Sequence, residues 1–489
     1  MNSVERIDEN ESVGSLAHRS HWGRSVGTAR IKSRTDEPLD AIVIGGGCAG
    51  FAAATALVES GARVLVVEAR PGLGGRATAF TDPETGERVD NGQHILMGCY
   101  AETLALLDRI GAANRVRWQT GLKLSMIDRR GHHSVLALPA LPSPLHFLAG
   151  VLAWDALSWR ERLSVLKIGV MIKPANPSAF AGGQSGQLRR DKLGLSVRAW
   201  LEQNGQAPRL CELFWEPLAL AALNQSIDQA EASNFMRVLE RIFGPDPAAA
   251  AIVLPAVPLD EMYAEPSRAW LVDRGSEVRV NAPAKILIDG QRVRGVRVRD
   301  ETIEAPLVIS TVPWHSFHAL FDEAPAGLEQ TIANATALAS LPIVTVNLWF
   351  DSAVMQEPLV GLPGRNFQWI FDRRAIVGGD ASHLSMISSG AETIVAQSNE
   401  VLTSMALTEV REALPAARSA KLRKSLAVRE KRSTFSLAPD APPRPGTQTS
   451  IEGFLLAGDW IETGLPATIE SAVMSGHMAA KYATETRRH

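Results

Sequence analysis

A glycine-rich segment that follows a short apolar stretch constrains this chain more than any other feature. Residues 40–44 (DAIVI) are typical of a buried strand in a parallel sheet. They lead into residues 45–50 (GGGCAG), a G-x-G-x-x-G set, and then into an alanine-rich stretch with helical character that ends at Gly61. A second apolar stretch, residues 63–68 (RVLVVE), follows directly. This order of strand, glycine loop, helix and strand predicts a βαβ unit.

The glycines of this segment have separate tasks in such a unit. Gly45 permits the tight turn, Gly47 lets a pyrophosphate approach the backbone, and Gly50 lets the helix pack closely on the strand. The first helical turn, at Ala49, offers free N–H groups and a positive dipole end to phosphates. Glu68 ends the second strand, where a carboxylate accepts hydrogen bonds from ribose hydroxyls. The pattern predicts a dinucleotide site; the alternative is a glycine-rich turn in an unrelated α/β protein.

The residues after the second strand indicate which dinucleotide is bound. They read EARPGLGGR and include Glu68, Ala69, Arg70, Gly74, Gly75 and Arg76. Arginine forks at such positions bind phosphate or carbonyl oxygens. This E-x-R-x-G-x-G-G-R run resembles the signature of the flavin amine oxidase and phytoene desaturase superfamily. There the run lies along the pyrophosphate and isoalloxazine of FAD, so the resemblance implies FAD as the cofactor. A surface Gly/Arg loop is the alternative.

A third motif lies near the C-terminus. A strand is expected to run into Gly458 and Asp459, and a helix to begin after Pro466. The helix start, at Thr468 and Ile469, is expected to face the flavin pyrimidine, whose negative charge on reduction a helix dipole stabilises. Asp459 resembles the superfamily aspartate near the ribityl chain or pyrophosphate; the alternative is a turn aspartate that caps a helix.

Further stretches resemble one narrower family. They are residues 89–100 (VDNGQHILMGCY), 214–218 (FWEPL), 254–271 and 457–476. Together they resemble hydroxysqualene dehydroxylases, FAD enzymes of hopanoid biosynthesis. The resemblance implies reductive removal of the hydroxyl of hydroxysqualene, a long apolar isoprenoid, to give squalene. It also implies FAD contacts at Gly92 and Val280, although an ordinary strand valine is as good an interpretation of Val280.

Two residues are candidates for the proton donor to the departing hydroxyl. The resemblance places the loop of His94 beside the flavin, and imidazole titrates near neutrality. A structural histidine bonded to backbone is the alternative for His94. Glu470 is the second candidate, and its place at a helix N-terminus is expected to lower its pKa and make it a poorer acid.

Several alternatives for the activity stay open. A polyprenoid desaturase would use the same flavin geometry with the opposite hydride direction. An amine oxidase is disfavoured because the chain has only three tyrosines to surround an amine. A non-catalytic flavoprotein that serves as a scaffold for terpenoid-pathway enzymes is an alternative of another class. The chain lacks a second G-x-G-x-x-G set for NAD(P)H, so a partner reductase is one candidate source of electrons.

The nucleotide-binding motifs lie at the start, middle and end of the 489 residues, which exceed a single usual core. We therefore expect an α/β fold, an FAD/NAD(P)-binding Rossmann-like domain with an interleaved α+β substrate domain, as in amine oxidases. The FAD-binding domain is expected to comprise residues 39–116, 245–315 and 426–484, and the substrate-binding domain residues 117–244 and 316–425. Residues 1–38 are polar, lack the apolar stretch of a signal peptide and are expected to form a disordered extension.

Charge and cysteine content limit the kinds of partner, the metal sites and the compartment to be expected. A net charge of −3, with both signs spread along the chain, gives no reason to expect nucleic acid as a partner. Three cysteines without a Cys/His cluster predict no metal site and fit a reducing, cytoplasmic compartment. Prolines interrupt the longest uncharged stretch, so no membrane-spanning helix is expected.

A tryptophan- and leucine-rich region, residues 142–172, admits three interpretations. It lines an apolar cavity, or it is ordinary core, or it faces a membrane surface. In the last case Trp154 and Trp159 would lie at the lipid headgroups, and Arg160 and Arg162 would contact lipid phosphates. The protein would then be peripheral on the cytoplasmic membrane.

Overall fold

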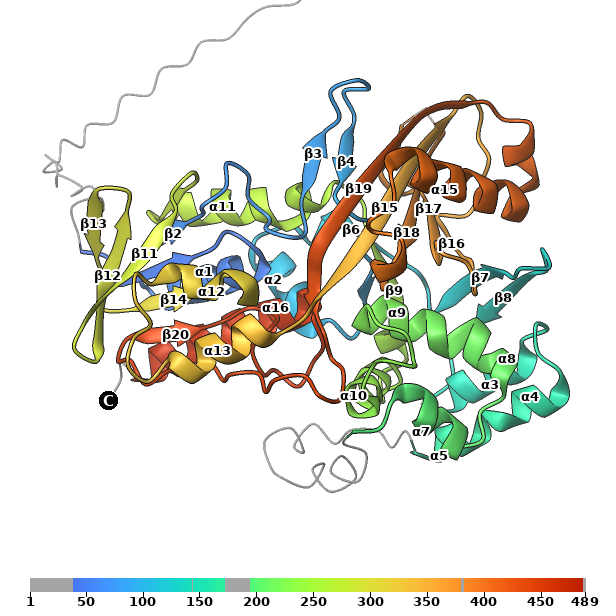
Figure 1. The fold of residues 1–489 in the computed structure, drawn as a ribbon, viewed down its shortest axis with the longest axis horizontal. Coiled ribbons are helices and arrows are strands. Elements are labelled where there is room, and N and C mark those ends of the chain that lie inside the picture. Colours follow the sequence, from blue (N-terminus) through green and yellow to red (C-terminus); the bar gives the residue numbers. More distant parts are fainter. Residues whose placement is uncertain (1–37, 143, 172–193, 380–381, 487–489) are drawn as a thin grey trace, which may run out of the picture. The chain divides into compact units, whose positions relative to one another are not determined.

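The computed structural model describes residues 38–142, 144–171, 194–379 and 382–486, and nearly all of the expected N-terminal extension (1–38) lies outside them. A parallel sheet of five strands has the order β10-β2-β1-β14-β20, and Figure 1 labels β2, β14 and β20 of this sheet. The strands are β1 (Ala41–Ile44), β2 (Val64–Val67), β10 (Glu277–Arg279), β14 (Val308–Ser310) and β20 (Phe454–Leu456). The sheet thus unites the start, the middle and the end of the chain, as the motifs predicted.

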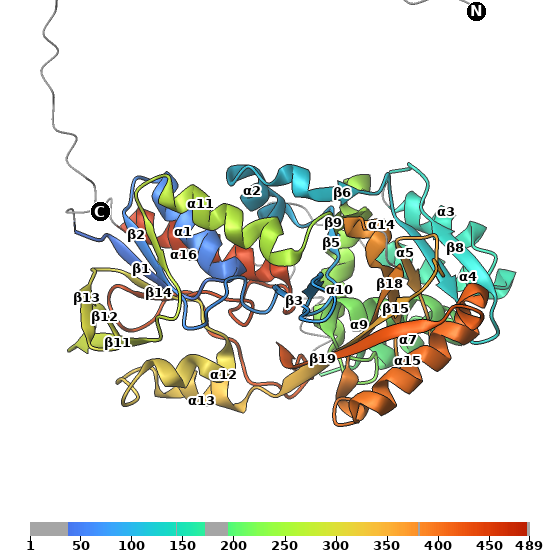
Figure 2. The ribbon, with the colours of Figure 1, turned by 90° about the horizontal axis from the view of Figure 1, so that it is seen from above.

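The helices α1 (Cys48–Glu59) and α16 (Ile469–Thr486) lie side by side (Figure 2). Small residues permit this contact, because Ala52 and Ala53 of α1 are fully buried and Gly476 of α16 lies against them. A Cβ added to Gly476 would lie 2.3 Å from the carbonyl oxygen of Ala49, far inside van der Waals contact. The last helix is therefore held against the N-terminal turn of the first, which brings its own N-terminus towards the glycine loop.

A second, seven-stranded sheet has the order β19-β15-β18-β17-β16-β7-β8 and is antiparallel except between β16 and β7. Its strands are β7 (Lys123–Ile127), β8 (His133–Ala137), β15 (Ser340–Phe350), β16 (Leu359–Gly361), β17 (Trp369–Asp372), β18 (Ser382–Ser388) and β19 (Leu422–Phe435). The strands β15 and β18 are almost wholly buried. The long strands β15 and β19 extend from this sheet towards the parallel one (Figure 1).

Three smaller sheets complete the strands. They are the hairpin β3 (Ala79–Thr81) and β4 (Arg88–Asp90), the set β5 (Leu96–Met97), β9 (Ile252–Pro255) and β6 (Val116–Trp118), and the set β11 (Ala284–Asp289), β12 (Arg292–Val298) and β13 (Glu301–Glu304). The hairpin leads directly into the segment of Gly92 and His94.

The remaining helices surround the sheets. They are α2 (Ala101–Arg109), α3 (Leu145–Ala153), α4 (Trp159–Ser164), α5 (Leu166–Met171), α7 (Val197–Gln203), α8 (Pro208–Leu210), α9 (Glu216–Leu223), α10 (Ala232–Ile242), α11 (Glu265–Val272), α12 (Trp314–Phe317), α13 (Glu329–Ala337), α14 (Arg373–Val377) and α15 (Asn399–Ala413). Short 3₁₀ or π turns occur at Ala113–Arg115, Cys211–Trp215, Pro247–Ala250, Asp260–Ala264, His318–Leu320, Ala391–Thr393 and Pro415–Arg418.

The expected fold class is confirmed, with a Rossmann-like parallel sheet and a second part of mixed helices and strands. The division into two domains stays a prediction. Its boundary between residues 425 and 426 falls within β19, which pairs with β15 along its length.

Within the described ranges, no helix combines the length and the apolar character that a membrane span requires. The same ranges hold no group of three or more metal-ligating side chains. For the region 142–172 the structure corrects one expectation: Trp154 is 1% exposed and belongs to the core, so it does not lie at a lipid headgroup. Trp159, in contrast, is 69% exposed.

Candidate functional site

A groove of about 760 Å³ lies where the parallel strands β1, β2, β14 and β20 end. Its size is within the usual range of cofactor sites, and the carboxyl ends of parallel strands are the usual place for them. The residues expected to contact FAD that line it are Gly45, Gly47, Ala49, Glu68, Ala69, Arg70, Gly74, Gly75, Arg76, Gly92, Gly458, Asp459, Thr468 and Ile469. Segments from three distant parts of the sequence therefore meet in one place.

The glycine loop has the close contacts that the sequence predicted. Gly45 has φ +115°, and a Cβ there would lie 2.4 Å from Oγ1 of Thr311. A Cβ on Gly50 would lie 1.9 Å from the carbonyl oxygen of Gly45, so Gly50 packs the helix on the loop and does not line the groove. A Cβ on Gly75 would lie 3.5 Å from Cα of Gly47. Gly47 and Gly75 thus form a cradle of adjoining backbone without side chains, against which a pyrophosphate can lie.

The groove also supplies donors for phosphates. Helix α1 begins at this cradle, and among the described residues none caps it with a side chain or puts a carboxylate in its first turn. Its N–H groups and dipole are therefore available to an anion. Glu68 accepts N–H bonds from Gly46 (2.8 Å) and Arg70 (2.9 Å), which fixes its carboxylate at the groove wall.

His315, in α12, lines the groove and lies close to several positively charged side chains. Burial and then the charges of Arg432, Arg76 and Arg70 lower the pKa of His315 to about 4. The Asp459 carboxylate opposes this effect, but the guanidinium groups outnumber it and give this part of the groove a positive potential. Such a potential favours the diphosphate of a dinucleotide, so the residues present fit FAD.

Arg76 and Asp459 contact each other across the groove. The guanidinium donates to the two carboxylate oxygens at 2.9 and 2.5 Å and to the carbonyl oxygen of Ser433 at 2.8 Å. It also lies over the ring of Trp314, 5.2 Å from the centroid. Although burial opposes the charged form, the Asp459 carboxylate raises the pKa of Arg76. Both residues are expected to contact the cofactor, and the structure places them in the groove as a pair.

We expect Asp459→Ala to destabilise the FAD-free protein by about 2 kcal/mol. Removal of one member of a buried ion pair leaves the other charge uncompensated, and the 28% exposure of Arg76 reduces the usual cost. Urea unfolding of the FAD-free protein measures the effect. Adding Arg76→Met should recover part of the loss, because it removes the stranded charge; an unchanged or larger loss in the double variant would contradict this explanation.

His94 lies in the segment after β4 and lines the groove. Its Nδ1 is 2.8 Å from the carbonyl oxygen of Gly92, which favours the tautomer with hydrogen on Nδ1 and an unprotonated Nε2. Burial lowers the pKa of His94. Arg373 holds the segment by donating to Gln93 (2.5 Å) and to Asp90. These features favour a neutral imidazole, a poorer proton donor than the sequence suggested.

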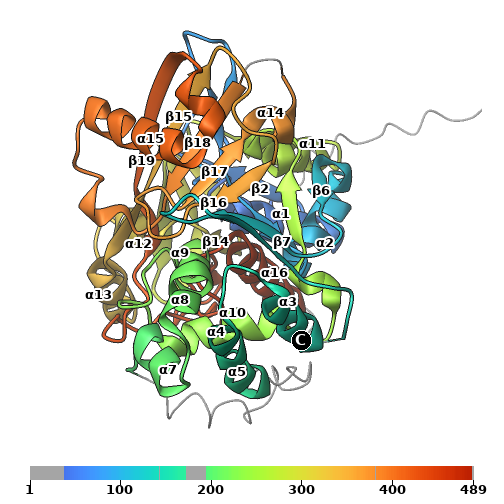
Figure 3. The same cartoon turned by 90° about the vertical axis from the view of Figure 1, so that its right-hand side faces the viewer.

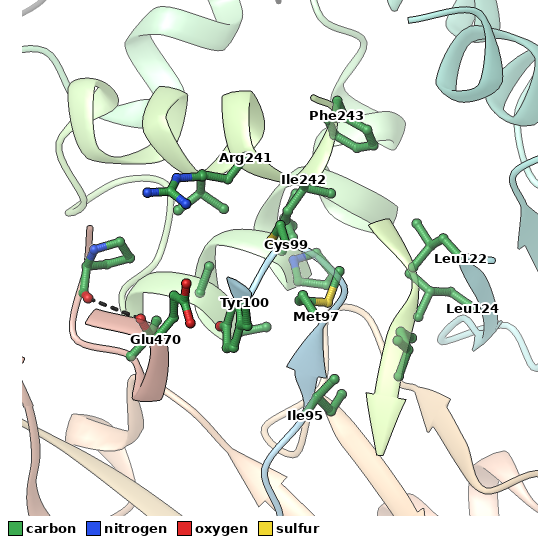
Figure 4. Close-up of a pocket in the computed structure, with 18 of the residues that line it drawn as sticks. Ile95, Met97, Cys99, Tyr100, Leu122, Leu124, Arg241, Ile242, Phe243 and Glu470 are labelled. Atoms are coloured by element: carbon green, nitrogen blue, oxygen red, sulfur yellow. Dashed lines mark hydrogen bonds between the residues drawn. The ribbon is translucent and has the colours of Figure 1, made fainter. Parts of the chain in front are cut away.

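A second, smaller cavity of about 130 Å³ adjoins the groove. The two share Ile95, Tyr100, Ala221, Ala222, Trp369 and Thr468 in their walls. Apolar side chains from β5, β7, α9 and α10 line most of the smaller cavity, and Figure 4 shows Leu122, Leu124 and Phe243 at the end away from Glu470 and Arg241. The cavity therefore has an apolar end and a charged end. No described residue of 142–172 lines it, which disfavours the cavity interpretation of that region.

Glu470 occupies the charged end of this cavity and is 2% exposed. Its carboxylate accepts N–H bonds from Glu102 (3.0 Å) and Thr103 (2.9 Å), at the N-terminus of α2, and a bond from the Thr103 hydroxyl (2.7 Å). The structure corrects the expected direction of its pKa: burial raises the pKa of Glu470 despite these bonds. Desolvation outweighs the helix N-termini.

Sequence reasoning missed several residues of the groove. Trp369 lines both cavities, is 7% exposed, and its indole N–H has no partner among the described residues. His315 and the β19 segment 429–434 also line the groove, and no motif marked them. Val280 is not part of the wall, whereas Ala282 is. For these residues only the pairing of distant strands determines proximity, so no local signal was available.

Comparisons with known proteins agree with this geometry. The family model described as flavin containing amine oxidoreductase matches residues 48–484. The 15-cis-phytoene desaturase of Glycine max is 25% identical over 93% of this chain and 81% of its own length. The 15-cis-phytoene desaturase of Synechococcus elongatus is 25% identical over 90% of this chain and 94% of its own. The crystal structure of an oxidoreductase from Methanosarcina mazei has the same fold, with a TM-score of 0.68, 16% identity and coverage of 91% of this chain and 100% of that one.

Proposed function

Because the chain belongs to the flavin-containing amine oxidoreductase family, and is therefore an FAD-dependent oxidoreductase, we propose that it exchanges hydride with a long apolar isoprenoid. The observation that carries this proposal is the apolar cavity that adjoins the cofactor groove. Its volume accommodates only part of a C30 chain, so the remainder would extend along the groove it joins. The phytoene desaturase names of the relatives support an isoprenoid as the substrate class.

Within this class we propose reductive dehydroxylation of hydroxysqualene to squalene. A hydrocarbon offers nothing to a buried polar group, whereas an alcohol presents a hydroxyl that needs a polar partner. The charged end of the cavity, with Glu470 and Arg241, is such a partner in an otherwise apolar wall. The reaction takes the alcohol and reduced FAD to the hydrocarbon, oxidised FAD and water, so its atoms and electrons balance.

The cofactor would supply the hydride, and the residues of the chain would bind the cofactor and keep water from the substrate. Bound FAD supplies the hydride when it is reduced. Gly47, Gly75 and the N-terminus of α1 would hold its pyrophosphate, and Thr468 and Ile469 would lie at its pyrimidine. The apolar wall excludes water from the allylic cation that forms when the hydroxyl leaves.

We propose that Glu470 gives the proton to the departing hydroxyl oxygen. Burial raises its pKa, so this carboxyl takes up a proton more readily than an exposed one, and it lies in the cavity wall. His94, with a lowered pKa and its Nδ1 at the Gly92 carbonyl, would instead help to shape the groove as a neutral ring.

Desaturation of a polyprenoid is the second candidate. The relatives that are named phytoene desaturases and align along most of their length favour it. In that reaction oxidised FAD would take hydride from a saturated carbon, a base would remove a proton from its neighbour, and no acid would be needed at a leaving oxygen.

One experiment separates the two reactions. Photoreduced holoenzyme is mixed anaerobically with hydroxysqualene, oxidised holoenzyme is mixed with squalene, and the flavin spectrum and the extracted products are followed. Dehydroxylation is expected to reoxidise the flavin and release squalene in the first mixture only. Flavin reduction and a new double bond in the second mixture would support desaturation, and no flavin change with either compound would overturn the isoprenoid proposal.

A further inference from the structure

The helices α4 and α5 present an unusual exposed stripe. Trp159, Leu163 and Leu166 are 69%, 52% and 40% exposed. Trp159 and Leu163 are four residues apart, and Leu163 and Leu166 are three apart. This spacing places side chains on one face of a helix. The buried side chains of the same segment, Val165 and Ile168, contribute to the core. The segment therefore has an apolar face towards the protein and a second apolar face towards solvent.

The stripe has apolar neighbours. Leu145 is the first residue of α3 and Leu141 lies four residues before it; they are 55% and 39% exposed. Helix α3 contacts both α4 and α5, and Figure 3 shows the three together at the lower end of the view. Five of the nine large apolar side chains that are exposed among the described residues therefore fall within residues 141–166. Single exposed leucines are ordinary, but such a cluster marks an interaction surface.

Basic side chains flank the stripe. At about 100° per residue, Arg160 and Lys167 lie on one side of it, and both are exposed. Arg162 lies on the other side, with its guanidinium 4.8 Å from the ring centroid of Trp159. It already donates to the carbonyl oxygens of Leu157 (2.8 Å) and Leu152 (2.9 Å), so Arg160 and Lys167 are the flanking charges available to a ligand. The acidic Glu161 turns back to accept the N–H of Ser158 at the helix start. The surface thus combines tryptophan, leucines and positive charge.

We propose that this stripe docks the protein on the surface of an anionic phospholipid bilayer. Apolar side chains with a tryptophan at their edge enter the headgroup boundary, and flanking Lys and Arg contact lipid phosphates. The charge pattern favours an anionic bilayer over a second copy of the chain, because two copies packed stripe to stripe would bring their positively charged flanks together. Docking requires no turnover, so the proposal stands apart from the proposed function.

The position of the stripe would also suit a substrate from the bilayer. Phe147, on the buried face of α3, contacts Phe243 and Phe214 with ring centroids 4.3 and 5.5 Å apart. Both partners line the apolar cavity, and Phe243 lies at its apolar end (Figure 4). Helix α3, which contacts α4 and α5, thus connects the helices of the proposed lipid contact to the wall of the cavity.

Co-sedimentation of the FAD-bound full chain with vesicles tests the docking. Vesicles of phosphatidylcholine with phosphatidylglycerol should bind the protein, and vesicles of phosphatidylcholine alone should bind it more weakly. The triple variant Trp159→Ser, Leu163→Ser, Leu166→Ser should lose about tenfold or more in affinity. Arg160→Glu with Lys167→Glu should weaken binding to the anionic vesicles by about tenfold or more and reduce its salt dependence. FAD content and circular dichroism confirm that each variant is folded.

Matched controls make the result specific. Val272→Ser with Val401→Ser changes two other exposed apolar residues and should bind vesicles like the wild type. Brominated lipids should quench tryptophan fluorescence, and Trp159→Phe should remove the quenching while Trp118→Phe, at another exposed site, should not. The proposal would be overturned if the wild-type protein did not bind anionic vesicles, or if the triple variant bound them like the wild type. A dimer that the triple variant dissociates would assign the stripe to a second copy instead.

Discussion

Gly47→Val is expected to give a folded protein that is colourless and does not take up FAD. Gly47 has φ −101° and ψ −171°, an extended conformation that valine adopts readily, so the backbone is not strained. A Cβ there would meet Cα of Gly75 at 3.8 Å, an ordinary contact, but the two γ-methyl groups would fill the cradle where the pyrophosphate must lie. We expect the affinity for FAD to fall by about a hundredfold or more, since a steric clash of a few kcal/mol has this effect.

Flavin fluorescence on titration of the FAD-free protein measures this affinity, and circular dichroism measures folding. Gly72→Val is the matched control, because Gly72 belongs to the neighbouring glycine segment, has nothing within 4 Å of an added Cβ and does not line the groove. It should bind FAD like the wild type. A Gly47→Val protein that keeps its yellow colour would show that the pyrophosphate lies elsewhere, which would also remove the basis for the cofactor-side assignments.

The parts of the site that could be predicted from the sequence are those where the backbone must pack closely against its neighbours. At Gly45 and Gly50 an added Cβ would lie within 2.4 Å of a neighbouring atom, so only glycine fits, and the requirement is visible as a motif. Glu68 was equally predictable, because its position at the end of β2 follows from the local βαβ pattern.

Residues whose role depends on distant strands could not be predicted. Trp369 and the segment 429–434 reach the groove because β17 and β19 belong to the seven-stranded sheet, and nothing in their local sequence encodes that pairing. The pairing of Arg76 with Asp459, which are 383 residues apart, was hidden for the same reason. The expected pKa of Glu470 rested on the helix dipole alone. Burial has the larger effect, so the pKa of Glu470 is raised and not lowered.

Glu470→Gln is expected to lower the rate of dehydroxylation by about 10²–10⁴-fold, the usual contribution of a general acid. Glutamine keeps the size of the side chain and one acceptor for the N–H groups of α2, but its amide is not an acid and cannot donate the proton. The single-turnover rate of flavin reoxidation with hydroxysqualene measures the effect, after FAD content has been matched. His94→Gln should lower the same rate by less than about tenfold, because a neutral imidazole with a lowered pKa does not serve as the acid.

The pH dependence separates proton donation by Glu470 from a structural role. An acid must be protonated to act, so the wild-type rate should fall as the pH rises through the pKa of Glu470, and burial moves that fall to a higher pH than an ordinary carboxyl would give. Glu470→Gln should abolish this fall and leave a slow, flat profile.

Thr103→Ala provides the control for the hydrogen bonds around the carboxyl. It removes the hydroxyl that donates to Glu470 at 2.7 Å but leaves the proton donor in place. Loss of a bond that favours the carboxylate should raise the pKa of Glu470 further, so the fall in rate should move to higher pH with little change in the maximal rate. If Thr103→Ala and Glu470→Gln instead slow the reaction equally and leave the profile unchanged, Glu470 only holds the N-terminus of α2, and the proton must come from another group.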